Sequence, residues 1–433
     1  MSIQDTISHD MIPQDVADTI VDPKAYSAEK PVDEAFAFLR KEMPFARAQP
    51  EGFDPFWVVT KHADILEVER QNDLFHNGDM ATTLTPIDVD RKVREMMGGS
   101  PHLVRSLVQM DNPDHMAYRR LTQAWFLPPN IKKLEGRIRD IAKVFIDRMA
   151  DMGGECDFAK DVALYFPLHV IMEVLGVPEA DEPRMLKLTQ ELFGSNDPDL
   201  NRAGAEHTSF EAGLASMQQT IGDFITYFNA ITEDRRANPR EDLSSVIANG
   251  QIGGQPLDHF AAMSYYIIAA TAGHDTTSNT TASGLWALVE RQDQLKRLQG
   301  DLSLIPSFME ETIRWATPVK HFMRSATADT VVHGREVAKG DWMMLCYPSG
   351  NRDEDVFDAP FEFRIDRTPN KQLAFGYGAH LCIGQHLARM EMRIFWEELL
   401  SRLKSIEFAG TPKLSQSNFV CGPKSIPIRY KMN

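Results

Sequence analysis

Hydrophobic residues recur with helical spacing along most of the chain, and strand-like runs are short. Apolar positions three and four residues apart predict a helix over 32–43. The aromatic and β-branched run at 56–61 predicts a strand, followed by a helix over 62–71. From about 114 to 300 the pattern is mostly helical. The clearest helical stretches in that part are 131–152, 157–176 and 216–239, the last ending at Pro239.

Strand signals return towards the C-terminus. β-branched runs separated by turn glycines predict short strands near 330–333, 336–338 and 341–345, and 417–430 predicts a hairpin. No internal repeat or low-complexity linker divides the chain. We therefore predict a mainly α fold with minor β, built as a single domain over residues 1–433.

Two segments lack a regular pattern. We expect residues 1–30 to form a loosely structured arm. Residues 79–108 include Gly98, Gly99 and Pro101, and they predict a long mobile loop. Because long loops often carry function, this loop is a candidate region for substrate access.

Residues 258–291 predict one central helix, because they contain no proline and almost no charge before Glu290. At ~1.5 Å per residue such a helix would be roughly 50 Å long. Its middle reads Gly273-His274-Asp275-Thr276-Thr277, a sequence that weakens a helix and buries an acid. Two interpretations compete here. One is a satisfied polar cluster in the core, and the other is a widened groove with an acid and a hydroxyl beside a ligand.

Composition limits the class of protein. The chain has 433 residues, of which 43% are hydrophobic and 25% charged, as in ordinary globular proteins. Its four cysteines form no disulfide pattern and its N-terminus does not resemble a signal peptide, so we expect a protein of the reducing cytoplasm. No apolar run is long enough to span a membrane. The net charge of −16 argues against nucleic acid as a partner.

An acid and a base stand three residues apart in the helix predicted near 305–319. Glu311 and Arg314 share one face of that helix. An exposed pair of this kind stabilises a helix by only ~0.2–0.5 kcal/mol, so alone it indicates little. Its position between the central helix and a glycine-rich loop makes it more informative.

The glycine-rich loop surrounds Cys382, within 374–393. A phosphate loop would need Lys-Ser or Lys-Thr after the glycines, and a thiol nucleophile would need a strand–Cys–helix turn. Zinc could use His380, Cys382 and His386, but a fourth ligand is missing. An inert packed thiol leaves the glycines without a purpose. A thiolate ligand to haem iron fits better, because Gly376, Gly378 and Gly384 would let a flat macrocycle approach the backbone, with Phe375 packed beside the ring.

The loop FGYGAHLCIG resembles the haem loop of the cytochrome P450 family, FGxGxHxCxG. AGHDTT is similar to that family's oxygen-activation motif, and EETIR to its ExxR motif. The three motifs occur in the family's order, and the resemblance covers nearly the whole chain. One departure is Glu362, which stands where the family often has an arginine; Arg367 is our candidate to complete the Glu311–Arg314 network.

The resemblance implies a role for each matching residue. Cys382 would be the axial ligand of haem b, and Asp275 and Thr276 would relay protons to dioxygen. The remaining positions implied to bind the cofactor are His115, Arg119, Ala272, Arg324, Phe375, Gly376, His380 and Gly384; among them, His115, Arg119, Arg324 and His380 would pair with the haem propionates. The implied reaction inserts one oxygen atom from O₂ into a C–H bond. The alternative is a haem-thiolate sensor or a zinc-binding protein without catalysis.

The expected substrate is a small hydrophobic molecule. The candidate pocket residues are mostly apolar: Ile268, Thr271, Val319, Phe419 and Val420. Residues 167–194 resemble the terpineol-hydroxylating branch of the bacterial family, which implies a monoterpenoid or an alkyl-aromatic hydrocarbon.

The resemblance also implies an external electron source, because no flavin or NAD domain is recognised. We expect an iron–sulfur ferredoxin with an NAD(P)H-dependent reductase, and a monomeric enzyme. Basic residues near the thiolate, namely Arg119–Arg120, Lys132–Lys133 and Arg389, are candidates to meet an acidic ferredoxin.

Overall fold

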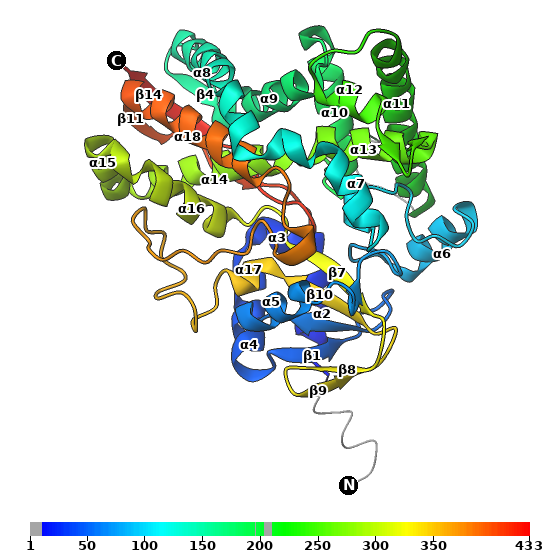
Figure 1. Ribbon diagram of the computed structural model, residues 1–433. Coiled ribbons are helices and arrows are strands. Elements are labelled where there is room, and N and C mark those ends of the chain that lie inside the picture. Colours follow the sequence, from blue (N-terminus) through cyan, green and yellow to red (C-terminus); the bar gives the residue numbers. More distant parts are fainter. Residues whose placement is uncertain (1–10, 195, 203–209) are drawn as a thin grey trace.

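The computed structural model describes residues 11–194, 196–202 and 210–433 (Figure 1). The predicted fold class is confirmed, since helices form most of the molecule and the sheets are small. In Figure 1 the main sheet and helices α2–α5 form the lower part, with most of the longer helices above them. The cavity described below lies where the main sheet and these helices meet.

The N-terminal segment is helical, so the prediction of a loosely structured arm over 1–30 is wrong for the described residues; 1–10 lie outside them. Helices α2 (Gln14–Val21) and α3 (Pro23–Ala28) precede α4 (Lys30–Glu42). Asp22 caps α3 by accepting a hydrogen bond from the Lys24 N–H, and Pro23 supplies a fixed φ at its first turn. Ala17 and Ile20 are buried, so α2 packs one apolar face onto the fold.

The main sheet has five strands in the order β1-β2-β10-β7-β3. β2 and β10 are parallel, and the other neighbours are antiparallel. The strand predicted at 56–61 is present as β2, and the helix predicted after it is α5 (His62–Arg70). The strand bounds are β1 Phe45–Ala48, β2 Phe56–Val59, β3 Phe75–His76, β7 His321–Ala326 and β10 Trp342–Cys346.

The remaining strands form small sheets. The predicted strands near 330–338 form the hairpin β8 (Thr330–Val332) and β9 (Arg335–Val337). The prediction of one C-terminal hairpin over 417–430 is wrong, because its two strands join different sheets: β13 pairs with β12, whereas β14 pairs with β11 and β4. The bounds are β4 Glu155–Asp157, β5 Gln251–Ile252, β6 Gln255–Pro256, β11 Leu403–Phe408, β12 Lys413–Leu414, β13 Pro423–Ser425 and β14 Pro427–Met432.

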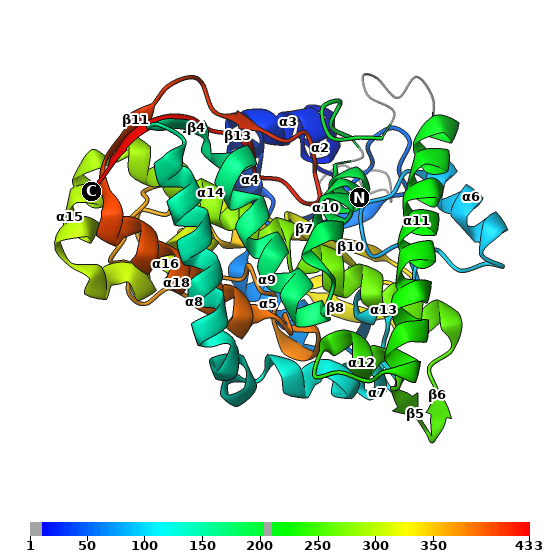
Figure 2. The same ribbon diagram turned by 90° about the horizontal axis from the view of Figure 1, so that it is seen from above.

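The longer helices build the main core. α18 packs against α8 and α16, and α14 packs against α16 and α9 (Figure 2). Trp396, Phe395, Phe166 and Phe308 are buried where these helices meet. Helix bounds are α7 Asp114–Gln123, α8 Pro128–Asp151, α9 Tyr165–Leu175, α10 Glu182–Phe193, α11 Phe210–Ala237, α12 Leu243–Ala248, α15 Gln292–Gly300, α16 Ile305–Ala316, α17 Tyr347–Gly350 and α18 Gln385–Arg402.

Residues 79–108 are not one long loop. They contain α6 (Ile87–Met96) and a 3₁₀ turn at Leu107–Gln109. Arg94 pairs with Asp90 one turn earlier at 2.6 Å, a contact that supports a helix with few apolar residues. The sparse apolar pattern of this exposed helix explains why periodicity did not reveal it.

The central helix is interrupted. α13 (His259–Ala272) ends before Gly273, and α14 (Asp275–Glu290) begins after His274. A Cβ on Gly273 would lie 2.7 Å from the Ile171 side chain, so glycine is required for α9 to pack this closely. The prediction of one continuous helix over 258–291 is therefore wrong at its centre, where the two helices meet beside the cavity.

Candidate functional site

A cavity of about 810 Å³ lies between the junction of α13 and α14, helix α7, strand β7 and the loop before α18. Most of the residues predicted to form the site line this one cavity. They are His115, Arg119, Ile268, Thr271, Ala272, Thr276, Val319, Arg324, Phe375, Gly376, His380, Cys382, Gly384, Phe419 and Val420. The fold thus brings together positions more than 300 residues apart in the sequence.

Cys382 lies immediately before α18, with its side chain exposed in the cavity. Its N–H donates to the Phe375 carbonyl at 2.9 Å, which closes the loop. Gly376 and Gly378 both have φ of +67°, a conformation that other residues rarely adopt. Desolvation raises the pKa of the Cys382 thiol, while the Gly384 N–H and the Arg119 guanidinium act in the opposite direction. A metal cation bound to the sulfur would further stabilise the thiolate, which the Gly384 N–H and Arg119 stabilise only in part.

Cationic and imidazole groups line the same cavity. Arg119 donates through Nη2 to the Leu381 carbonyl at 2.7 Å, and Arg324 is only 4% exposed. The rings of His115 and His380 lie 4.1 Å apart. Burial, together with the charge of Arg119, lowers the pKa of His115 to about 4, and burial lowers that of His380 well below its usual value.

These residues fit a haem. Both ring nitrogens of His115 are buried without a hydrogen-bond partner, so the cavity lacks a polar group that the haem carboxylates would supply. Arg119 and Arg324 provide positive charge for the same carboxylates. Cys382 provides a thiol from a loop whose glycines keep side chains out of the cavity.

Asp275 and Thr276 lie at the start of α14. Thr276 lines the cavity and donates its hydroxyl to the Ala272 carbonyl at 3.0 Å, whereas Asp275 points away from the lining. Asp275 Oδ1 lies 3.1 Å from Nδ1 of His274. Burial raises the pKa of Asp275 to about 7 and lowers that of His274 to about 4. Because His274 uses Nε2–H to donate to the Leu164 carbonyl at 2.8 Å, its Nδ1 faces the acid as an acceptor.

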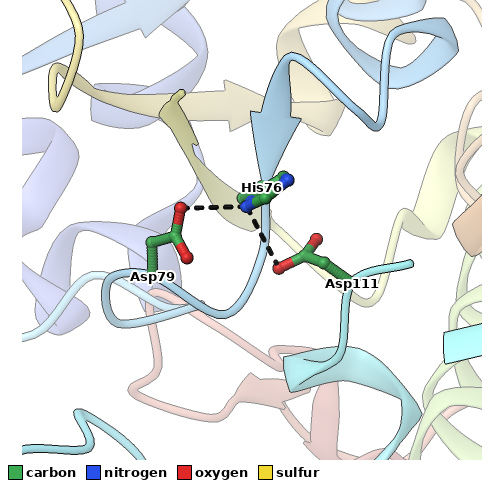
Figure 3. A group of neighbouring side chains, drawn as sticks. All are labelled: His76, Asp79 and Asp111. Atoms are coloured by element: carbon green, nitrogen blue, oxygen red, sulfur yellow. Dashed lines mark hydrogen bonds and ion pairs between the residues drawn. The ribbon is translucent and has the colours of Figure 1, made fainter. Parts of the chain in front are cut away.

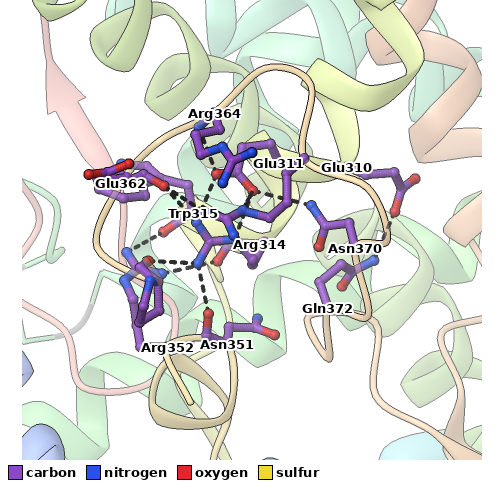
Figure 4. Close-up of polar contacts among 12 residues, drawn as sticks. Glu310, Glu311, Arg314, Trp315, Asn351, Arg352, Glu362, Arg364, Asn370 and Gln372 are labelled. Carbon is purple, nitrogen blue, oxygen red and sulfur yellow. Dashed lines mark hydrogen bonds and ion pairs between the residues drawn. The ribbon is translucent and has the colours of Figure 1, made fainter. Parts of the chain in front are cut away.

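Glu311 and Arg314 form a buried network rather than an exposed pair (Figure 4). Arg314 donates to both Glu311 oxygens, at 2.7 and 2.8 Å. Burial acts to raise the pKa of Glu311, but the hydrogen bonds from Arg314 outweigh it and keep the pKa below its usual value.

Arg367 makes the contact predicted for it, since its Nε donates to Glu311 Oε2 at 3.0 Å. Its other donors hold the carbonyls of Asp358, Ala359 and Glu362. Glu362 contributes this backbone carbonyl while its side chain is exposed. The departure from the family pattern at Glu362 therefore leaves the network complete.

Two buried acids of the cavity were missed by sequence reasoning. Glu69 on α5 and Glu391 on α18 are 4% and 2% exposed, and both line the cavity. Each had a signal in the sequence: Glu69 is four residues after Ile65, and Glu391 is four after Leu387, so both fall on the apolar face of a helix. An acid on such a face is a candidate for a buried functional group.

One group of potential metal ligands lies outside the cavity lining. The ligand atoms of His76, Asp79 and Asp111 lie within 4.8 Å of one another (Figure 3). Asp111 accepts hydrogen bonds from the backbone N–H groups of Asn77 and Gly78 at 2.8 and 2.7 Å. These two bonds are enough to explain why Asp111 lies beside this loop. Cys382 belongs to no such group within the described part of the chain, so the zinc alternative for Cys382 gains no support there.

Comparisons with known proteins agree with this geometry. The family model of cytochrome P450 matches residues 87–430. Cytochrome P450-terp from Pseudomonas sp is 47% identical over 419 residues, covering 97% of this chain and 98% of that protein. Linalool 8-monooxygenase from Pseudomonas putida is 30% identical, covering 94% and 97% respectively.

Solved structures extend the likeness to three dimensions. The crystal structure of CYP108D1 from Novosphingobium aromaticivorans is 42% identical, with a TM-score of 0.89 over 98% of this chain and 100% of that one. A search of the described helices found none long and apolar enough to cross a membrane. The predicted family is confirmed: the chain belongs to the cytochrome P450 family and is a monooxygenase.

Proposed function

We propose that this enzyme binds haem b through Cys382 and hydroxylates a small hydrophobic substrate, a monoterpenoid or an alkyl-aromatic hydrocarbon, with O₂ and electrons from a ferredoxin. The observation that carries this proposal is that the Cys382 thiol and the Thr276 hydroxyl open into the same apolar-walled cavity. A thiol ligand and a hydroxyl near the reacting oxygen are the two protein groups that the reaction needs at close range.

In this proposal the haem is held from several sides. Cys382 would bind the iron, and Arg119, Arg324, His115 and His380 would hold the carboxylates. Phe375, Ala272, Gly376 and Gly384 line the same cavity and would contact the macrocycle. When bound, the haem supplies the activation of dioxygen and the oxidising power for insertion into a C–H bond. The remaining chemistry is the supply of protons and the exclusion of water.

Asp275 and Thr276 would supply the protons. Asp275 is buried with a raised pKa of about 7, so near neutral pH it can hold a proton beside His274 Nδ1. If the Asp275 side chain turned towards the cavity, it could give its proton to the Thr276 oxygen while Thr276 gave its own hydroxyl proton to an acceptor in the cavity. Thr276 would keep one proton throughout, and its O–H could then donate to the Ala272 carbonyl again.

The cavity walls favour a small apolar substrate. Ile268, Val319 and Val420 line it with methyl groups, and Phe322 and Phe419 meet edge to face at 5.5 Å. Thr271 also lines the cavity, but its hydroxyl is already donated to the Ile267 carbonyl at 2.8 Å. The similarity of this chain to linalool 8-monooxygenase supports a small terpenoid as the substrate.

The proposed ferredoxin surface is smaller than the sequence suggested. Arg119 points into the cavity and Arg389 pairs with Glu310 at 2.5 Å and lies over the Phe375 ring, so both are engaged within the protein. Arg120, Lys132 and Lys133 are exposed and remain candidates to meet an acidic partner. Reversing these three charges should slow reduction at low salt; an unchanged rate would exclude this surface.

A spectrum of the reduced, CO-bound protein tests the proposal. We expect the strongly red-shifted Soret band of thiolate-ligated haem, and Cys382→Ala should abolish it while haem absorbance remains. Titration of the ferric protein with monoterpenoids and alkyl-aromatics should shift its spin state. A colourless protein with stoichiometric zinc would refute haem binding, and a haem protein that activates no oxygen with any electron donor would favour a sensor.

A further inference from the structure

Glu69 is a buried cavity acid that the proposed function does not use. It lies in the last turn of α5 and lines the cavity together with Arg324 of β7 and Tyr347, the first residue of α17. Its side chain is 1% exposed. The backbone of Gly378 in the loop before Cys382 packs directly onto the Glu69 peptide, so the acid is fixed relative to that loop.

The Glu69 carboxyl group is only half satisfied by the protein. Tyr347 donates its hydroxyl to Oε1 at 2.7 Å. Arg324 Nη2 lies 3.6 Å from the same oxygen, which is too far for a hydrogen bond. Oε2 is buried without any partner. A buried carboxyl oxygen left in this state is costly unless it carries a proton or another group completes it.

The nearest charged group connects this acid with the haem. Arg324 uses Nη1 for the Met323 carbonyl, and its side chain lines the cavity. If Arg324 binds a haem carboxylate, as proposed above, then Glu69 and that carboxylate flank one guanidinium. Two carboxylates that share one cation in a buried site disfavour double ionisation, so each of them binds a proton more tightly than it would alone.

We propose that Glu69 takes up a proton when the haem is reduced, and that in its protonated form it hydrogen-bonds a haem carboxylate beside Arg324. This inference rests on the haem binding proposed above. Glu69 takes one proton from water as one electron from the redox partner enters the bound haem. On reoxidation Glu69 returns that proton to water. The change in the charge of Glu69 thus offsets the change in the charge of the haem in each direction.

The surroundings of Glu69 place this exchange near neutral pH. Burial raises the pKa of Glu69 to about 7, while Arg324 and the Tyr347 hydroxyl act to lower it. The N–H of Tyr377 faces it from the loop. The neighbouring imidazoles do not titrate in this range, because burial lowers the pKa values of both His115 and His380. Ionised Glu69 would stabilise the ferric haem, so reduction becomes harder as pH rises through its pKa.

The test is the midpoint potential of the full-length, haem-loaded protein between about pH 6 and pH 8, a window centred near neutrality. We expect the wild-type potential to fall as pH rises, and the potential of Glu69→Gln to stay constant. An equal slope in both proteins would overturn the inference. A protein without the thiolate CO band would instead contradict the proposed haem site, so the two failures are distinguishable.

Glu391→Gln is the matched control, because Glu391 is also a buried acid of the cavity. Burial raises the pKa of Glu391 well above its usual value, and its hydrogen-bond partner is Thr277, so it is not paired with Arg324. We therefore expect Glu391→Gln to keep the wild-type slope, and loss of the slope in this variant would assign the proton elsewhere.

Tyr347→Phe provides a second test of the inference, which can be used if Glu69→Gln does not bind haem. Tyr347→Phe removes the hydrogen bond that favours ionised Glu69. The pH range over which the potential falls should move to higher pH in this variant. An unmoved range would contradict the assignment to Glu69.

Discussion

Glu311 and Asp275 are both buried acids, but their surroundings differ in almost every respect. Glu311 is 0% exposed and receives hydrogen bonds from Arg314, Arg367, Asn370 and the Arg364 N–H. Asp275 is 9% exposed and lies beside the neutral imidazole of His274, and burial is the main influence on its carboxyl group. The pKa is therefore lowered for Glu311 and raised to about 7 for Asp275. A buried carboxylate whose oxygens all receive hydrogen bonds stays ionised and supports the fold. A buried carboxyl group without a cationic partner can exchange a proton near neutral pH.

The largest effect is expected from Glu311→Gln. This change leaves Arg314 and Arg367 buried without their anion, and breaking such a pair typically costs about 3–5 kcal/mol of unfolding free energy. Urea unfolding should give a reduced midpoint, and little haem-loaded protein should be recovered. A variant that unfolds at the wild-type urea concentration would show that the network does not anchor the fold.

Asp275→Asn should lower turnover. Asparagine keeps the shape of the neutral acid but cannot deliver a proton, so product formation should fall by about 10²-fold, the lower range for a lost general acid. In the wild type, turnover should decline as pH rises through about 7, where Asp275 ionises. Steady-state rates against pH would check this, and a variant with a wild-type rate would remove Asp275 from the proton path.

Stability should respond to pH with opposite sign at the two acids. Glu311 has a lowered pKa in the folded protein, so its contribution is present above its unfolded pKa and is lost as pH falls through the folded value. Asp275 has a raised pKa, so its contribution is present below its unfolded pKa and is lost as pH rises through about 7.

Denaturation of wild type and Asp275→Asn across about pH 4 to 8 would isolate the second effect. The wild type should lose stability relative to the variant as pH rises. A constant difference between the two proteins would mean that Asp275 has an ordinary pKa.

The smallest effect is expected from Glu362→Ala. The Glu362 side chain is exposed, and only its backbone carbonyl accepts from Arg314 and Arg367. The unfolding free energy should therefore change by no more than about 0.5 kcal/mol. A loss comparable with that of Glu311→Gln would place the side chain in the network after all.

The sequence motifs were sufficient to predict most of the site but not the states of its acids. The contact of Arg367 with Glu311 was expected from the family resemblance, because Glu362 stands where the family often has an arginine. Gly273 marked a weak point in the central helix, but its close packing against Ile171 of α9 follows only from the tertiary fold. Glu69 and Glu391 fall on the apolar faces of their helices in the sequence, but only the fold shows that they share one cavity. Helix α6 escaped detection because ion pairs, rather than an apolar face, support it.

The contact at Gly378 has a consequence for how this enzyme can be altered. A Cβ at that position would lie 2.2 Å from the Glu69 carbonyl, so the loop before Cys382 rests on the backbone of α5 with no room for adjustment. The position of the Cys382 sulfur therefore depends on α5, which packs with the main sheet. Ile268 and Thr271 belong to α13, another wall of the cavity. If haem binds as proposed, substitutions at Ile268 or Thr271 should change substrate preference while leaving the loop before Cys382 in place.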